Sequence, residues 1–395
     1  MSHGSVVAYA GPTTASVSRV MDALLTAGRV VARDRVLRPG WISVRDGMIA
    51  ALGQGEPPEP ATHAFGDAVL VPGFVDVHCH GGGGATFGAD LEATQRAVAT
   101  HHAHGTTTLV ASLVSAPVGS LRREVDALAE LVSGGDIAGV HLEGPWLAEA
   151  YCGAHDPRAL IAPTVDDVDA LVRPGVVRMV TIAPELLGGL DAVRRVVAAG
   201  AVAAIGHTAS DGTVVSDALR AGATHATHLF NAMPPLHHRQ PGAVLALLDS
   251  DATLELIRDG HHLHPDLCQW LDSAVEPERL VAVTDAMAAA GAADGDYTLG
   301  SMAVTVAHAV ARVAGTGTLA GSTATADMLF RSVAHASSAD ADLLRAAAQT
   351  ASNPALALGF RDVGALEAGR RADVVVLDPA SLEVRAVLRG GEEIR

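Results

Sequence analysis

Short apolar runs alternate with longer amphipathic stretches along most of the chain. Short apolar runs bounded by polar or glycine-containing stretches are typical of buried strands. They predict eight strands, over residues 69–77, 106–113, 137–142, 177–183, 202–206, 225–230, 254–257 and 280–284. Between them, helical spacing of apolar residues predicts helices over 91–104, 121–132, 191–199, 211–221 and 265–274. Alternating strands and helices indicate a parallel sheet, and eight such units predict that it closes into a TIM-like (β/α)8 barrel of the α/β class.

The two ends of the chain have a different pattern. Residues 20–52 and 372–389 form short alternating runs separated by turn residues, which predicts short strands. Each end is too small to bury a core by itself, so we expect the two to pack together as one discontinuous β-sandwich domain. The expected division is a flexible tail over 1–18, a small β domain over 19–70 and 364–395, and a catalytic barrel over 71–363.

The composition and charge of the chain exclude several classes of function. The formal charge of −17 opposes binding to nucleic acid or to an acidic membrane surface. No apolar stretch approaches the roughly 20 residues that span a bilayer, and the N-terminus lacks a signal-peptide pattern. Three scattered cysteines suit a reducing compartment, so we expect a cytoplasmic protein. All 27 basic residues are arginine. Without lysine there is no Schiff base, no P-loop lysine and no carboxylated lysine between two metals.

Polar residues follow the predicted strands at their carboxyl ends. His78 and His80 close the first strand, and alternate residues of a strand share a face. Glu143, His207 and Asp285 end three of the later strands, and His228 lies within the end of another. In a barrel these ends form one rim, where catalytic residues gather. Imidazole nitrogens and carboxylate oxygens are ligands for Zn²⁺ or another first-row divalent ion, so the rim is a candidate metal site.

Several motifs then identify a resemblance. They are PGFVDVHCHG, HGTTTLVAS, HLEGPW, GHT, THLFNAMPPLHHR, DGHH, VTDAM, LAGS and GRRADVVVLD, spread from about Gly28 to Gly391. With them the chain resembles the amidohydrolase superfamily and, within it, the N-acetylglucosamine-6-phosphate deacetylase family. HLEGP and HLFNAM are specific to the deacetylases, whereas the first His-x-His and the late Asp285 are shared much more widely.

The resemblance implies a role for each residue of the rim. Glu143, His207 and His228 would hold the principal metal, and His78 and His80 would complete a second metal position. The ion would be Zn²⁺, with Fe²⁺, Co²⁺ or Mn²⁺ as alternatives, and it lowers the pKa of water to about 7. Asp285 would be the general base that takes the proton of water and returns it to the departing amine. His155 would stabilise the oxyanion and contact the substrate.

The substrate implied by the resemblance is a phosphorylated amino sugar. Arg239 offers a bidentate fork for phosphate oxygens, and turn amides precede it after Asn231. The family positions that contact the sugar match His155, Gly144, Asn231, Ala232, Arg239, His262, Leu319, Ala320 and Gly321. Related enzymes tend to be dimers, so we expect a homodimer in which Arg239 reaches the neighbouring site.

The predicted reaction is hydrolysis of N-acetyl-D-glucosamine 6-phosphate to D-glucosamine 6-phosphate and acetate. Two enzymatic alternatives are deacetylation of N-acetylgalactosamine 6-phosphate or of an unphosphorylated acetamide. A third alternative is a sugar-phosphate binding protein without activity, although binding alone does not require a base such as Asp285. Of the remaining candidates, His101, His102 and His104 are interpreted as structural, and Cys152 as a loop thiol near the site.

Overall fold

The predicted barrel is present. The computed structural model describes residues 22–335 and 337–395; the expected tail over 1–18 lies outside them. The largest sheet has eight parallel strands that follow one another in chain order. They are β8 (Phe74–Cys79), β11 (Thr106–Val114), β12 (Gly139–Glu143), β13 (Val177–Ile182), β14 (Val202–Ile205), β15 (His225–Ala226), β16 (Thr253–Leu256) and β17 (Leu280–Ala282).

The barrel closes at a seam between β8 and β17. These two strands share no ladder, and the sheet order ends with them. They meet just beyond their carboxyl ends, where the backbone N–H of Asp285 donates to the carbonyl of His78 at 2.9 Å and that of His80 donates to Ala286 at 2.7 Å. One residue before Asp285, the hydroxyl of Thr284 donates to Oδ2 of Asp76 in β8 at 2.5 Å. The seam is therefore closed at the rim that carries the predicted site.

Two predicted strands differ from the structure. The run over 69–77 is not one strand but two, β7 (Val69–Pro72) and β8, separated by Gly73. A Cβ at Gly73 would lie 2.2 Å from the hydroxyl oxygen of Thr107, so the chain can turn from one sheet into the next only without a side chain there. The apolar pattern is continuous because both strands are buried. The strand predicted over 225–230 ends at Ala226, because His228 and Phe230 adopt a positive φ.

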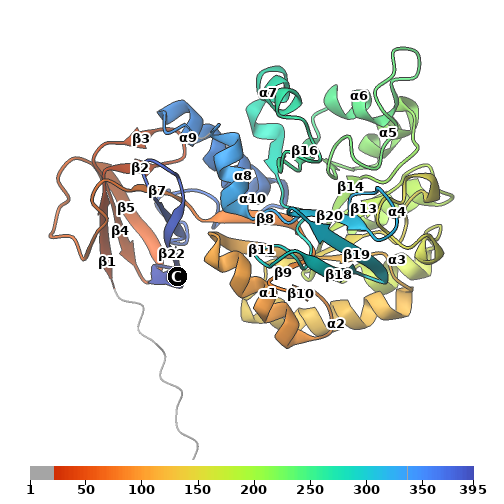
Figure 1. Cartoon of the computed structure of the whole chain (residues 1–395), viewed down its shortest axis with the longest axis horizontal. Helices are drawn as coiled ribbons and strands as arrows, with labels where there is room; N and C mark the ends of the chain where they lie inside the picture. Colours follow the sequence, from red (N-terminus) through yellow and green to blue (C-terminus); the bar gives the residue numbers. More distant parts are fainter. Residues whose placement is uncertain (1–21, 336) are drawn as a thin grey trace, which may run out of the picture.

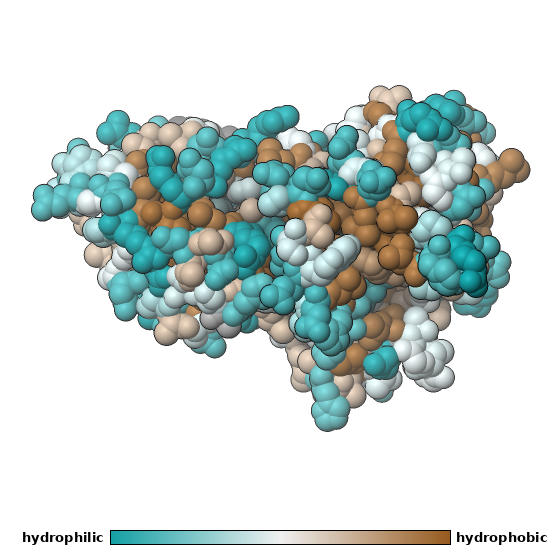
Figure 2. Space-filling model, turned by 90° about the horizontal axis from the view of Figure 1, so that it is seen from above, coloured by the Kyte–Doolittle hydropathy of each residue, from teal (hydrophilic) through white to brown (hydrophobic). Residues whose placement is uncertain are grey.

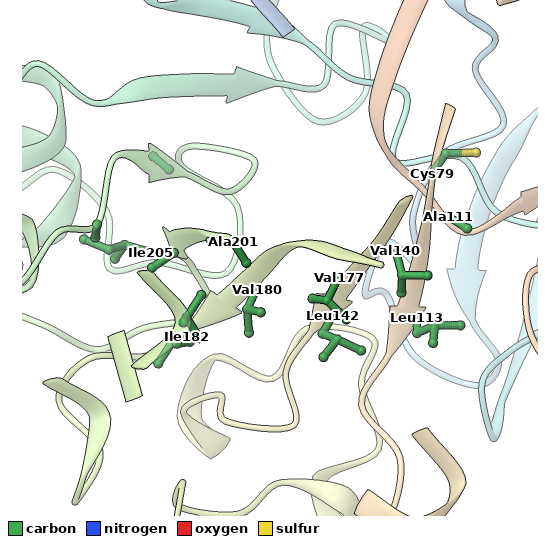
Figure 3. Packing of buried hydrophobic residues seen from close by; sticks show 14 of the residues in the cluster. Cys79, Ala111, Leu113, Val140, Leu142, Val177, Val180, Ile182, Ala201 and Ile205 are labelled. Atoms are coloured by element: carbon green, nitrogen blue, oxygen red, sulfur yellow. The ribbon is translucent and has the colours of Figure 1, made fainter. Parts of the chain in front are cut away.

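Helices cover the outside of the barrel; the five predicted from helical spacing are present, and those over 165–171 and 242–248 are additional. They are α1 (Leu91–Ala103), α2 (Val118–Gly134), α3 (Val165–Leu171), α4 (Gly189–Ala198), α5 (Gly212–Arg220), α6 (Gly242–Leu248) and α7 (Pro265–Ala274). Asp90 and Asp211 cap α1 and α5 by accepting backbone N–H groups. The helices pack on apolar strand residues in one buried cluster, which Figure 3 shows running from Cys79 to Ile205.

Strands from both ends of the chain form two further sheets. The first holds β5 (Met48–Gln54), β4 (Gly40–Arg45), β1 (Ala23–Ala27) and β6 (His63–Ala64) in that order. The second orders β23 (Glu392–Glu393), β22 (Val384–Arg389), β21 (Val374–Leu377), β7, β2 (Arg29–Val31) and β3 (Val36–Leu37). The C-terminal strand β21 pairs with the N-terminal β7, and one buried cluster joins both sheets. Figure 1 shows these sheets beside the barrel. The domain boundaries themselves stay a prediction.

The remaining elements connect the two parts or cover the rim. In Figure 1, α8 (Ala326–Val333), α9 (Asp340–Ala347) and α10 (Asn353–Ala357) lie between the terminal sheets and the barrel, with a π-helical turn over Ala348–Ser352. A three-stranded antiparallel sheet, β18 (Gly295–Leu299), β19 (Met302–Ala307) and β20 (Val310–Val313), follows β17 and was not predicted. In Figure 2, hydrophilic residues cover much of one face, and hydrophobic residues gather in two areas. Among the described residues, no helix combines the length and apolarity needed to cross a bilayer.

Candidate active site

The polar residues predicted at the strand ends meet at one point. His78 lies in β8 and His80 directly follows it, Glu143 ends β12, and His207, His228 and Asp285 follow β14, β15 and β17 within three residues. All six are buried. Cys79, between the two histidines, belongs to the apolar cluster on the helix side of the sheet (Figure 3). Strand alternation therefore turns both imidazoles of the pair into the barrel.

The carboxylate of Glu143 is the centre of the cluster. Five histidine Nε2 atoms surround it: those of His228, His207 and His78 lie 2.9, 3.1 and 3.5 Å from Oε1, and those of His155 and His80 lie 3.1 and 3.2 Å from Oε2. The Nε2 atoms of His207 and His228 are 3.0 Å apart, and those of His78 and His80 are 3.2 Å apart. Atoms this close can share a small cation with bonds of about 2.0–2.2 Å.

The hydrogen-bond partner of Nδ1 shows which of these histidines can bind a metal through Nε2. Nδ1 of His207 faces the carbonyl oxygen of Tyr151 at 2.8 Å, and Nδ1 of His80 faces that of Ser112 at 3.2 Å. A carbonyl oxygen only accepts, so Nδ1 carries the proton and Nε2 keeps a lone pair for a metal. Nδ1 of His78 likewise faces the carboxylate of Glu255 at 2.9 Å. Nδ1 of His228 is buried and has no hydrogen-bond partner among the described residues, and its Nε2 lies 2.9 Å from Oε1 of Glu143.

His155 has the opposite arrangement. The backbone N–H of Ser115 donates to its Nδ1 at 3.1 Å. The neutral ring therefore carries its proton on Nε2, where it points to Oε2 of Glu143 at 3.1 Å. An N–H at this place can donate to an oxyanion but cannot ligate a metal. The geometry separates His155 from the four possible ligands, although its Nε2 lies equally close to Glu143.

Asp285 lies beside the two histidines at the end of the first barrel strand. Its Oδ1 is 3.2 Å from Nε2 of His80 and 3.4 Å from Nε2 of His78. Burial opposes the charged carboxylate, but the positive charge of His78 and the hydrogen bond from His80 hold the pKa of Asp285 below its usual value. The carboxylate is therefore ionised and lies beside a cation site, where it can accept a proton from polarised water.

The cluster favours positive charge. Burial raises the pKa of Glu143, yet the surrounding imidazoles, His78 first, lower it well below its usual range. Burial also opposes a charged imidazole at His80, but the hydrogen bonds to Asp285 and Glu143 raise its pKa to about 9. Two buried carboxylates thus produce a negative potential that binds protons in the absence of a cation. The same potential favours a divalent ion.

Backbone strain concentrates at these residues. His207, His228 and Asp285 have φ values of 48°, 26° and 47°, and Ala232 has 51°. A positive φ costs residues other than glycine about 1–3 kcal/mol each, and such residues cluster at active sites. Here the strained turns aim side chains from strand ends toward the barrel axis.

A cavity of about 220 Å³ lies above the cluster. Six of the predicted substrate contacts line it: His155, Asn231, Ala232, His262, Leu319 and Gly321. Nδ1 of His262 donates to Asp259 at 2.8 Å, so the ring is held in place. The nearby His261 and His264 do not line the cavity. A groove of about 740 Å³ adjoins the cavity and shares His80 and Leu299 with it.

Three predicted contacts are not on the wall of this cavity. Gly144 and Ala320 are absent from the lining residues, although the neighbours Glu143, Leu319 and Gly321 are among them. Arg239 lies in an exposed loop, where its guanidinium meets Nε2 of His238 at 2.8 Å. Cys152 also lies outside the lining. The substrate contacts of all nine residues stay predictions; six of the nine line the cavity, and Gly144, Ala320 and Arg239 do not.

Sequence reasoning missed several residues of the site. Glu255 and His225 are fully buried and lie behind His78. The only signal for Glu255 is one charged residue in an apolar strand, Thr253–Leu256. Leu299, at the end of β18, and Thr318 also line the cavity. They come from the unpredicted sheet and the loop after it. His101, interpreted as structural, is buried beneath the site with Nε2 donating to the carbonyl of Gly81 at 2.8 Å.

Comparisons with known proteins identify the family of the chain. A sequence model described as the amidohydrolase family matches residues 69–394. Among solved structures, a mutant N-acetyl-D-glucosamine-6-phosphate deacetylase from Mycobacterium smegmatis, in complex with N-acetyl-D-glucosamine-6-phosphate, is 47% identical with a TM-score of 0.92, over 94% of this chain and 99% of that one. Human N-acetylglucosamine-6-phosphate deacetylase is 38% identical over 83% of both chains. N-acetylgalactosamine-6-phosphate deacetylase from Escherichia coli O157:H7 is 34% identical over 94% of this chain and 99% of its own.

Proposed function

The chain belongs to the amidohydrolase family and, within it, to the N-acetylglucosamine-6-phosphate deacetylases, and from this we propose that it converts N-acetyl-D-glucosamine 6-phosphate to D-glucosamine 6-phosphate and acetate. The observation that carries the proposal is the convergence of four imidazole Nε2 atoms on Glu143, with Asp285 beside them and a donor N–H on His155. A binding protein needs no such set. The chain is a hydrolase.

The residues present fit a metal centre. Glu143, His207 and His228 would hold the principal ion, and His78 and His80 a second one. Glu143 would contribute to both, because its Oε1 lies near His207 and His228 and its Oε2 lies near His80. In the neutral rings of His207 and His80, the proton on Nδ1 is bound by a carbonyl oxygen, so Nε2 is free to ligate a metal. When bound, the ion polarises the amide carbonyl and lowers the pKa of water to about 7.

The protein residues then supply the proton transfers. Asp285 takes the proton of the attacking water and returns it to the nitrogen of the amide, because an amine leaves poorly unless it is protonated. His155 donates its Nε2–H to the oxygen that becomes negative during attack. Asn231, Ala232 and His262, with Leu319 and Gly321, would hold the sugar phosphate in the cavity.

The metal is best assigned as Zn²⁺, because imidazole and carboxylate ligands suit it. Fe²⁺, Co²⁺ and Mn²⁺ accept the same ligands. Metal analysis of purified protein, followed by activity of the chelated protein reloaded with each ion, distinguishes them.

A homodimer is part of the proposal. Arg239 does not line the cavity of its own chain, and the neighbouring Leu236 is 55% exposed. In a homodimer this exposed loop would contact the partner subunit, and Arg239 would bind the phosphate of the substrate in the partner's site. Light scattering of purified protein tests the dimer. We also infer a cytoplasmic location, which the three free cysteines support; fractionation of the producing cells tests it.

The experiment for the function is acetate release from a panel of acetylated sugars. N-acetylglucosamine 6-phosphate should be hydrolysed with the highest kcat/KM, and unphosphorylated N-acetylglucosamine poorly. N-acetylgalactosamine 6-phosphate is the second candidate, favoured by the 34% identical E. coli relative. Preference for that sugar would replace the first assignment, and no acetate from any member of the panel would refute both.

A further inference from the structure

Glu255 is a fully buried carboxylate that the proposed mechanism does not use. It lies in β16, whose neighbouring residues Leu254 and Leu256 face the apolar cluster on the helix side. Alternation therefore turns Glu255 into the barrel, behind the metal ligands. A buried charge of this kind is costly unless each oxygen is hydrogen-bonded.

Both oxygens of Glu255 are hydrogen-bonded to residues of the site. Oε2 accepts from Nδ1 of His78 at 2.9 Å and from the backbone N–H of His228 at 3.1 Å. Oε1 accepts from Nε2 of His225 at 2.9 Å. His225 is held in turn by the hydroxyl of Thr253 on the other side of its ring. The carboxylate is thus fixed at both ends, and it connects the side chain of one ligand to the backbone of another.

The bond from His78 to Glu255 crosses the seam of the barrel. β8 carries His78 and has no ladder with β17, its neighbour across the seam, whereas Glu255 belongs to β16, which is paired on both sides. The Nδ1 side of the His78 ring is therefore held by a carboxylate from a strand that is not next to β8, while Nε2 faces Glu143 and Asp285. His80 has a different anchor, the carbonyl oxygen of Ser112 in β11. Of the two histidines proposed to hold the second ion, Glu255 is hydrogen-bonded only to the side chain of His78.

We propose that Glu255 is a positioning residue that fixes His78 as a ligand and so sets the affinity of the metal position formed by His78 and His80. The proposal rests on the metal centre of the proposed function. The principal position depends on the side chains of Glu143, His207 and His228, of which Glu255 touches only the backbone N–H of His228. Loss of the carboxylate should consequently weaken one ion and spare the other.

The test is metal binding by Glu255→Gln, measured by titration of Zn²⁺ into chelated protein and by metal content per chain after dialysis. Outer-sphere partners of ligating histidines are worth about 10–100-fold in metal affinity. We expect the wild type to bind two ions and Glu255→Gln to bind one with unchanged affinity and the other about 10–100-fold more weakly. Glu255→Asp, which keeps the charge but shortens the side chain, should show the same selective loss and serves if the glutamine variant does not fold.

The matched control is Asp272→Asn. Asp272 is a largely buried carboxylate that binds Arg258 and Gln349 outside the centre, so it should retain both ions. Two tight ions in both Glu255 variants, equal loss of both ions, or a wild type with a single ion would each overturn the positioning role. A wild type that binds no metal would instead refute the metal centre itself, which separates the two failures.

Discussion

Replacement of His155 tests whether its side chain donates a hydrogen bond to the oxyanion or is a ligand of the metal. Its Nε2 lies 3.1 Å from Glu143, as close as that of the proposed ligand His207. Distance alone would therefore allow His155 to bind a metal, and Glu143, His155 and His207 do form a group compact enough to hold one. The N–H of Ser115 on Nδ1 argues otherwise, because it places the ring proton on Nε2.

The expected magnitude follows from this role. Removal of one oxyanion donor costs about 10²–10³ in kcat, or ~2.7–4 kcal/mol. We expect His155→Ala to lose activity by that factor and to retain its full metal content. Glutamine at this position can place an amide N–H near the place of Nε2, so His155→Gln should recover to within about tenfold of the wild type.

The assay is acetate release at saturating substrate, with metal per chain measured on the same samples. Unfolding by denaturant checks that both variants are folded, since the alanine variant leaves the buried N–H of Ser115 without its acceptor at a cost of about 1–3 kcal/mol. Loss of a metal ion in His155→Ala would show that His155 is a ligand. An unchanged kcat would show that it is neither ligand nor donor.

Four further predictions concern the other residues of the site. Asp285→Asn should lower kcat by about 10²–10⁴-fold with little change in KM, as expected for loss of a general base, while the helix-cap control Asp211→Asn stays within about twofold; equal effects would contradict the assignment. The double variant His78→Gln, His80→Gln should lower the metal content by one ion per chain in elemental analysis, and an unchanged content would show that the pair holds no metal. Arg239→Ala should raise KM for the 6-phosphate by about 10–100-fold and leave the unphosphorylated sugar unaffected, because a charge-assisted hydrogen bond is worth about 1.5–3 kcal/mol; an equal loss on both sugars would remove Arg239 from the phosphate site. In metal-free protein the hydrogen bonds to Asp285 and Glu143 raise the pKa of His80 from its usual value of about 6.5 to about 9, so its stabilisation is complete below about pH 6.5 and is lost as the pH rises to about 9. The Tm of chelated protein should therefore fall across that range, and a flat profile would contradict the pKa shift.

The barrel and its rim could be predicted because both depend on local patterns. Apolar runs and helical spacing are visible in the chain itself, and the carboxyl ends of parallel strands must share one rim. That argument alone brings His78, Glu143, His207, His228 and Asp285 together, and the structure confirms their proximity.

The parts that could not be predicted depend on contacts between distant residues. The break at Gly73 is hidden because β7 and β8 are both buried, so no polar residue marks the change of sheet. Glu255 meets His78 from 177 residues away, and no spacing in the sequence relates the two. The protonation of His155 is set by a backbone N–H, which carries no signature of residue type. The part of the cavity wall that contains Leu299 comes from the short antiparallel sheet β18–β20, which was not predicted from the sequence.

The most direct test is acetate release from N-acetylglucosamine 6-phosphate by one preparation in three states: as purified, after chelation, and after return of Zn²⁺. We predict that acetate and glucosamine 6-phosphate form in equal amounts, that chelation abolishes the reaction, and that the metal restores it. Full activity in protein proven free of metal, or no acetate from metal-loaded protein, would contradict metal-dependent deacetylation.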